Sequence, residues 1–266
     1  MVLGQGLATN EVKVFGEFSK EFNIRGARVL EIGGSVPVEF VRKKLVSSWT
    51  SVDPLNANRK VSDRYFEVDG LASDLPADSN EYDYVFSCNA FEHILDLEDS
   101  ISEIFRVVKP GGVLYSHFGP IWSAPDGHHL EGVKYKRKVY NFWTDNVIPN
   151  WYHLLFDPEE FAEILAASLE PELIRLITNY VYHSKQINRM FYEDYLEILF
   201  RSDFSIDAVI SIGEMDYTPS FSSFGNPLKR SKKINILKRV QERHGKNKKN
   251  LRCRDMKVLL SKPGVE

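Results

Sequence analysis

The sequence is poor in cysteine and lacks a long apolar run. Only Cys88 and Cys253 are cysteines among its 266 residues, too few for a disulfide framework or a four-cysteine zinc site. No stretch approaches the ~18 apolar residues of a membrane span, and residues 1–20 lack the basic start and apolar run of a signal peptide. These absences predict a soluble, cytoplasmic protein, with peripheral contact with a membrane as an open alternative. The content of 43% hydrophobic residues excludes a mainly disordered chain.

The formal net charge of −3 conceals an uneven distribution. From Lys229 to Lys257 there are thirteen basic and two acidic residues, net +11, whereas the remainder has 21 basic and 35 acidic residues, net −14. This basic segment is interpreted first as a solvated face. Contact with an anionic acceptor, such as a phosphorylated sugar, a lipid headgroup or a glycan, is the second interpretation. Nucleic acid comes third, because no recognised RNA-binding module accompanies the segment.

Short apolar runs alternate with stretches of helical spacing in the first half of the chain. Five such runs predict strands, over residues 28–32, 49–53, 65–69, 82–88 and 113–117. Helices are predicted after a cap at Asn10, over 38–46, and around Ile101 to Val108, because their apolar residues recur three or four positions apart. This alternation predicts an α/β fold, with a Rossmann-like, mostly parallel sheet and helices on both faces.

The alternation stops after residue 118. Residues 119–157 are rich in aromatic residues, histidine and proline and have no clear period, so they predict a long insertion near the strand ends. The remaining predicted elements are a helix over 158–167 capped by Asp157, a sixth strand over 173–182, an amphipathic helix over 185–200, an irregular basic stretch over 219–250, and a final strand over 256–261. The expected sheet therefore has seven strands, with insertions after strands five and six.

Polar residues follow four successive predicted strands. They are Glu31 with Gly33 and Gly34, Asp53, Asp69 with Gly70, and Ser87 to Asn89. In an open parallel sheet a ligand binds outside the carboxyl ends of the strands, where the strand order reverses. The sequence therefore predicts a single ligand site at this edge.

The spacing of these residues indicates a nucleoside ligand without phosphate. Asp53 lies 22 positions beyond Glu31, close to the ~20-residue offset at which a carboxylate binds both ribose hydroxyls; an ordinary turn cap is the alternative. The turn has only the first glycine of a dinucleotide fingerprint, and the Glu31 charge would repel a pyrophosphate. A cationic ligand with an amino-acid tail, such as S-adenosylmethionine, fits better.

The chain resembles a class I S-adenosylmethionine-dependent methyltransferase of the small-molecule type. The matching stretches, within residues 25 to 118, are 29–34, 51–54, 68–70 followed by 75–76, 82–87 with 91–94, and 106–114. The resemblance implies an N-terminal covering helix over 1–24, a cofactor-binding core over 25–183 with an acceptor-side insertion at 119–157, and a helical, basic insertion over 184–266 that includes the final strand. Ser35 and Pro37 depart from the family by replacing later glycines of the first turn.

The resemblance also assigns roles in cofactor binding. It implies that Glu31, Gly33 and Gly34 hold the methionine end of S-adenosylmethionine and that Asp53 binds the ribose. Asp69 would meet the adenine amino group, with the backbone of Gly70 and Leu71 near the ring. Asn89 would lie beside the methionine moiety through its main chain. Glu92 and His93 are interpreted as the start of the next helix, with an acid/base pair as the alternative.

The expected reaction is O-methylation of a small metabolite or glycan. Such catalysis depends on alignment and exclusion of water, with a base only if the nucleophile must lose a proton. His128 and His129 are predicted to contact or deprotonate the acceptor, because Gly127 permits a tight loop; loop-stabilising histidines are the alternative. A metal held by these histidines with His153 or Asp126 matches no spacing motif, so no metal is expected. An NAD(P)-dependent oxidoreductase and a non-catalytic methyltransferase-like binding module remain as alternatives, and the oligomeric state is left open.

Overall fold

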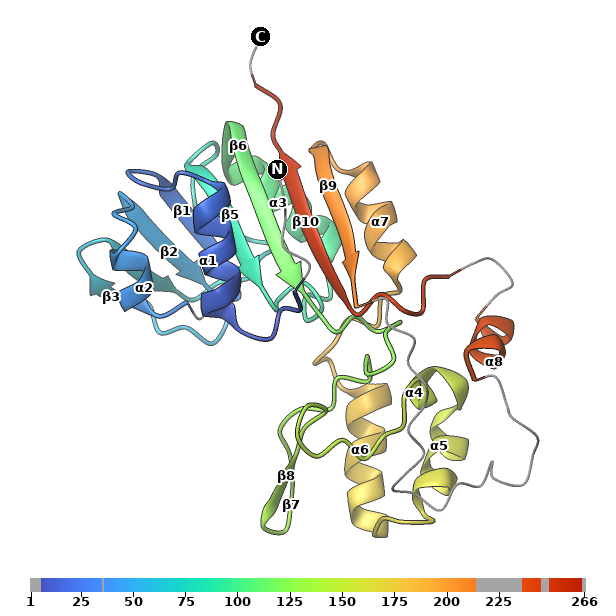
Figure 1. Ribbon diagram of the computed structural model, residues 1–266. Helices are drawn as coiled ribbons and strands as arrows, with labels where there is room; N and C mark the ends of the chain where they lie inside the picture. Colours follow the sequence, from blue (N-terminus) through green and yellow to red (C-terminus); the bar gives the residue numbers. More distant parts are fainter. Residues whose placement is uncertain (1–5, 35, 214–235, 245–248, 265–266) are drawn as a thin grey trace. The chain divides into compact units, whose positions relative to one another are not determined.

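The chain folds into two units built from interleaved segments (Figure 1). The computed structural model describes residues 6–34, 36–213, 236–244 and 249–264. The first unit comprises Met1–Gly119, Asp194–Gly213 and Asp255–Glu266, and the second comprises Pro120–Glu193 and Glu214–Arg254. The predicted cofactor residues thus belong to the first unit, whereas His128 and His129 belong to the second.

The first unit contains an eight-stranded sheet. In spatial order its strands are β3 (Arg59–Ser62), β4 (Tyr65–Val68), β2 (Ser48–Val52), β1 (Arg28–Ile32), β5 (Tyr82–Cys88), β6 (Val108–Phe118), β10 (Asp255–Ser261) and β9 (Ser205–Ile212). The five central strands are parallel, β10 is antiparallel to β6 and β9, and β3 is antiparallel to β4. The predicted Rossmann-like α/β fold is confirmed, with one strand more than expected. The strand order reverses between β1 and β5, which is where such sheets bind ligands.

One predicted strand is wrong. Residues 173–182 lie in helix α6 (Pro171–His183), whose buried residues Leu173, Ile174, Ile177 and Val181 form one helical face. Proline at the first helical position suits a helix start, and the apolar residues of this segment recur at helical spacing. The strand that follows helix α7 (Tyr192–Arg201) is β9 instead.

Helices cover both faces of the sheet (Figure 1). Helix α1 (Glu11–Glu21) lies on one face together with the short α2 (Val38–Arg42), and α3 (Leu97–Val107) lies on the other. The predicted cap of α1 is confirmed, because Asn10 Oδ1 accepts a hydrogen bond from the Lys13 amide at 3.0 Å. Phe18 of α1 is fully buried, with its ring 5.1 Å from that of Phe86 on β5. Aromatic packing thus holds α1 against the sheet.

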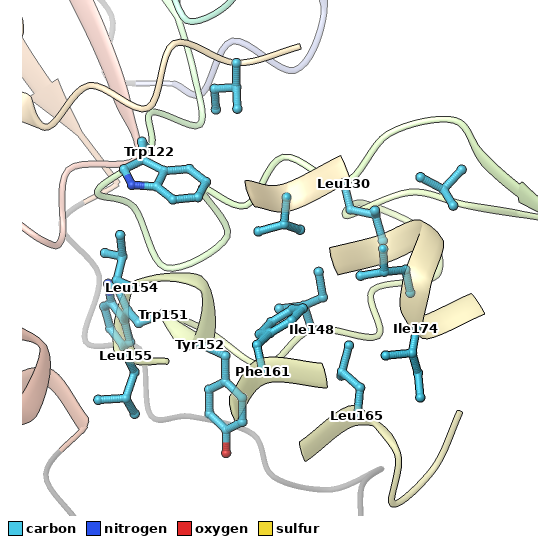
Figure 2. Close-up of a cluster of buried hydrophobic side chains, with 14 of the residues drawn as sticks. Trp122, Leu130, Ile148, Trp151, Tyr152, Leu154, Leu155, Phe161, Leu165 and Ile174 are labelled. Carbon is cyan, nitrogen blue, oxygen red and sulfur yellow. The ribbon is translucent and has the colours of Figure 1, made fainter. Parts of the chain in front are cut away.

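The second unit has its own apolar core (Figure 2). Its elements are the hairpin β7 (Val133–Tyr135) and β8 (Lys138–Tyr140) and the helices α4 (Tyr152–Leu155), α5 (Pro158–Leu165), α6 and α8 (Ile236–Arg243). The core includes Trp122, Trp151 and Phe161. The predicted cap of α5 is confirmed, since Asp157 and Glu160 form a capping box. In the part of the chain that the structure describes, helices are too short or too polar to cross a membrane.

Candidate functional site

Two glycines shape the turn that follows β1. Gly33 has φ 68°, and a Cβ there would lie 2.4 Å from the Cβ of Ala90. A Cβ at Gly34 would lie 1.9 Å from Ser51 Oγ. No real Cβ tolerates such distances, so only glycine fits both positions. The turn is therefore pressed against β2 on one side and the end of β5 on the other.

Glu31 supports this turn from beneath. It is 2% exposed, and its carboxylate accepts hydrogen bonds from Trp49 Nε1 at 2.6 Å and from the Val36 amide at 3.0 Å. The Tyr65 hydroxyl donates to the Val36 carbonyl at 3.0 Å. Burial, followed by the charge of Glu31, raises the pKa of Tyr65, so this hydroxyl stays a donor. These bonds hold the chain on both sides of the glycine turn in place.

Asp53 and Asp69 stand at neighbouring strand ends. β2 and β4 are parallel, Val52 pairs with Val68, and the Asp53 amide donates to the Val68 carbonyl at 3.2 Å. Asp53 is half-buried, and its Oδ1 accepts a hydrogen bond from the Leu55 amide at 2.7 Å. Asp69 is exposed. Both carboxylates can therefore receive donors from a ligand at this edge.

Two exposed leucines accompany these carboxylates. Leu55 is 93% exposed and Leu71 is 55% exposed. Leu71 was predicted here through its backbone, but Leu55 was missed. Its signal in the sequence is an apolar residue directly after Asp53-Pro54 at a strand end, where polar residues dominate. Exposed apolar side chains beside carboxylates suit a ligand that has both a flat ring and hydroxyl or amino donors.

Asn89 ends β5 beside the glycine turn. It has φ 49°, and its amide donates to the His117 carbonyl at 3.0 Å. Ser87 Oγ, on the same strand, donates to the Ile32 carbonyl at 3.1 Å. Ala90, which follows Asn89, is the residue against which Gly33 packs. The structure thus brings together at one edge of the first unit the residues predicted to bind cofactor, which are Glu31, Gly33, Gly34, Asp53, Asp69, Gly70, Leu71 and Asn89.

The charge of this edge fits a cationic ligand better than a phosphate. The segments at the strand ends contain acidic residues and no lysine or arginine; they are 31–36, 53–56, 69–71 and 89–92. Ser35 lies outside the described residues. A diphosphate would meet like charge here, whereas a sulfonium with an α-ammonium group would be attracted. The residues present therefore fit S-adenosylmethionine.

The histidines of the second unit are held inside a tight loop. A Cβ at Gly127 would lie 2.2 Å from the Ile121 carbonyl oxygen. His128 is fully buried and its Nδ1 accepts from the Leu130 amide at 3.1 Å; burial lowers its pKa well below the ordinary value. His129 is 5% exposed, with Nδ1 3.3 Å from the Pro120 carbonyl and Nε2 3.9 Å from a Glu131 carboxylate oxygen. These contacts stabilise the loop, and a role with the acceptor stays a prediction.

Part of the basic segment is used inside the protein. Lys257 is fully buried and its Nζ lies 2.9 Å from Glu17 Oε2. Arg254 pairs with Asp126 at 2.9 Å. Residues 229–235 and 245–248 of the segment lie outside the described residues. Lys257 and Arg254 therefore serve the fold, and contact of the segment with an anionic acceptor stays a prediction.

A buried histidine makes the stability of the first unit depend on pH. His117 is 1% exposed, and burial together with the charges of Lys257 and Lys13 lowers its pKa to about 3, although Asp255 lies 3.8 Å away. The unfolded chain binds a proton near pH 6.5. Stability is therefore full above this pH and falls as the pH drops toward 3, by up to about 1.4 kcal/mol per pH unit for this group.

The variant His117→Leu tests this dependence, because neither ring nitrogen makes a hydrogen bond within the described residues. Urea unfolding between pH 5 and pH 7 should give a shallower slope of unfolding free energy against pH for the variant than for the wild type. Equal slopes would contradict a neutral, buried His117.

The sheet order defines a Rossmann-like α/β domain, and its acid-lined edge lies where the strand order reverses. Residues 27–116 match the model of a family described as a methyltransferase domain. The matched residues include the glycine turn, Asp53, Asp69 and Asn89. Residues 27–116 are therefore similar to a methyltransferase domain, and the cofactor that fits the edge described above is S-adenosylmethionine.

Two characterised relatives match part of the chain. Sterol 24-C-methyltransferase erg6 of Schizosaccharomyces pombe is 30% identical over 137 residues, which are 47% of this chain and 35% of that protein. The ubiquinone/menaquinone biosynthesis C-methyltransferase UbiE of Idiomarina loihiensis is 27% identical over 107 residues, 40% of this chain and 38% of that protein. The chain thus matches little more than a third of the length of either relative.

Solved structures support the fold over most of the chain. An S-adenosylmethionine-dependent methyltransferase from Mesorhizobium loti superposes with a TM-score of 0.52 at 13% identity, covering 96% of this chain and 100% of that one. At this level of identity the likeness shows the fold alone.

Proposed function

We propose that the protein is an S-adenosylmethionine-dependent methyltransferase acting on a small-molecule acceptor. The observation that carries the proposal is the edge of the sheet where the glycine turn, Asp53 and Asp69 lie at neighbouring strand ends. The family match over 27–116 supports it, because the match falls on these residues.

We further propose how this edge holds the cofactor. Asp53 accepts hydrogen bonds from the ribose hydroxyls, and Asp69 accepts one from the adenine amino group beside Gly70 and Leu71. The backbone of Gly33 and Gly34 approaches the methionine end, which Asn89 borders. Glu31 acts on this end through the turn that it holds, since its oxygens accept from Trp49 and Val36.

The chemistry requires little covalent participation by the protein. Bound S-adenosylmethionine supplies a reactive methyl group on a sulfonium, so the protein's part is to align the acceptor and exclude water. O-methylation of a hydroxyl also requires a base. Of the two predicted histidines we favour His129, because it lies near a carboxylate whereas the low pKa of His128 makes that residue a weak base.

The acceptor is proposed to be a metabolite or glycan that is methylated on oxygen, with the basic segment as a contact for an anionic form. C-methylation is the second candidate, because both relatives described above are named as C-methyltransferases. Mass spectrometry of the labelled product formed in a cell extract would distinguish the two, since it locates the methyl group on oxygen or on carbon.

A thermal unfolding screen tests the proposed function against an oxidoreductase. S-adenosylhomocysteine at about 100 times its Kd should raise the Tm by several degrees, since ligand binding to the folded state adds about 2.7 kcal/mol. NAD and NADP should leave the Tm unchanged, and the reverse pattern would overturn the proposal.

Methyl transfer to a cell extract from labelled S-adenosylmethionine provides the second test, with His129→Gln as the variant. Labelled product from the wild type and little from the variant is the expected result. Binding of S-adenosylhomocysteine without any labelled product would favour a non-catalytic binding module.

A further inference from the structure

The residues ahead of α1, which we call the strap (residues 6–10), are held by two side chains, one at the start of a strand and one directly after another strand. Ala8 is 4% exposed, and both of its peptide groups are engaged. Its amide donates to Asp255 Oδ2 at 2.6 Å, and its carbonyl accepts from Asn89 Nδ2 at 2.8 Å. Asp255 begins β10 and Asn89 follows β5. A single residue of the strap is thus held by groups 81 and 247 positions away in the sequence.

Burying the carboxylate of Asp255 costs free energy unless hydrogen-bond donors face it. Its side chain is fully buried, and a buried carboxylate is stable only where N–H groups or cations face it. The Ala8 amide supplies a short bond to it, and His117 Nε2 lies 3.8 Å away. The strap therefore helps to stabilise the charge of Asp255, and Asp255 in turn fixes the strap.

Asn89 connects the strap to the cofactor edge. Its amide orientation follows from the Ala8 carbonyl, because only Nδ2 can donate to it. Its Oδ1 is buried and has no hydrogen-bond donor within the described residues. The neighbouring Ala90 is the residue against which Gly33 packs. A shift of the strap therefore acts on the residue that borders the glycine turn.

We propose that docking of the strap is linked to occupancy of the cofactor site, with Asp255 as a positioning residue and Asn89 as the group that both share. The proposal rests on the proposed function. Because such coupling is reciprocal, the cofactor should order the strap to the same extent as the strap tightens cofactor binding.

The test measures S-adenosylhomocysteine affinity and amide hydrogen exchange of residues 6–18 in the full chain. In the wild type, the ligand should slow exchange of the Ala8 amide. Asp255→Ala should lower the affinity about tenfold, a typical size for such coupling, and should abolish the ligand's effect on exchange. Asp255→Asn keeps an oxygen acceptor and should restore part of both. A purely structural role for Asp255 would lower the Tm but leave the exchange response intact.

The control is Glu17→Gln, which removes the ion pair of the buried Lys257 on the same strand but leaves both Ala8 bonds in place. The affinity of Glu17→Gln for S-adenosylhomocysteine should stay within about twofold of the wild-type value, a smaller change than the tenfold loss expected for Asp255→Ala. If Asp255→Ala does not fold, Ala8→Pro serves instead, because proline lacks the donor while Asp255 is retained.

The outcomes separate the two proposals. If the wild type binds S-adenosylhomocysteine and both Asp255→Ala and Ala8→Pro bind it equally well, the linkage is wrong and the cofactor assignment stands. If exchange of the Ala8 amide does not respond to bound ligand, the linkage is wrong as well. Failure of the wild type to bind S-adenosylhomocysteine would overturn the proposed function itself, and the linkage with it.

Discussion

Replacing Asp53 with alanine is expected to weaken binding of S-adenosylhomocysteine by about two to four orders of magnitude. Each hydrogen bond to a charged group contributes about 1.5–3 kcal/mol, and the proposed role gives this carboxylate two of them. Asp53 is only half-buried and stands at the end of β2, so the fold should survive its removal. Isothermal titration calorimetry gives the affinity, and the Tm of the free protein verifies folding.

Two variants separate the ligand contact from the local turn. Asp53→Asn retains an oxygen acceptor for the Leu55 amide and so preserves the turn, but it loses the charge. It should bind more weakly than the wild type and more tightly than Asp53→Ala. Asp63 lies in the same unit, and its side chain is 98% exposed. Asp63→Ala should therefore leave the affinity for S-adenosylhomocysteine unchanged. Equal affinities for all four proteins would show that Asp53 is only a turn residue.

Gly34→Ala should damage both stability and cofactor binding. The added Cβ would lie 1.9 Å from Ser51 Oγ and 2.9 Å from the Glu31 carboxyl, and both neighbours belong to the buried support of the turn. Overpacking of this kind costs about 1–3 kcal/mol of unfolding free energy. The turn must also shift, so S-adenosylhomocysteine binding should fall below detection by calorimetry.

The matched control for this variant is Gly16→Ala in α1. A Cβ at Gly16 meets no atom within 4 Å, and alanine in a helix is favoured over glycine by roughly 0.5–1 kcal/mol. Urea unfolding should therefore show a small gain in stability and calorimetry an unchanged affinity. A Gly34→Ala protein as stable and as tight in binding as the wild type would contradict the close packing of the turn.

Local signals explain what the sequence predicted well. The strand β5 has the predicted bounds, Tyr82–Cys88, because a mostly apolar and aromatic run is followed by the polar Asn89. The caps at Asn10 and Asp157 were recognisable because each satisfies backbone amides of its own first turn. The cofactor residues were placed by their position after strands, which the topology of a parallel sheet brings to one edge.

Contacts between distant segments explain what the sequence did not reveal. The prediction of a strand over 173–182 is wrong, because the apolar residues of α6 form one helical face that packs in the core of the second unit. The edge strand β3 has only four residues, none of them fully buried, so it has no apolar alternation to recognise. The bonds of Glu31 to Trp49 and of Ala8 to Asp255 depend on tertiary packing, and neither pair is marked by a local pattern.

The placement of β10 between β6 and β9 has a consequence for biosynthesis. β10 consists of residues 255–261 and follows β6 and β9 in the sequence, but it lies between them in the sheet and pairs with both. During translation, β6 and β9 would emerge with unpaired edges, and the whole of the second unit's sequence would be made before the strand that joins them. Exposed edges of this kind invite aggregation. The nascent chain should therefore depend on chaperones until residues 255–261 have left the ribosome.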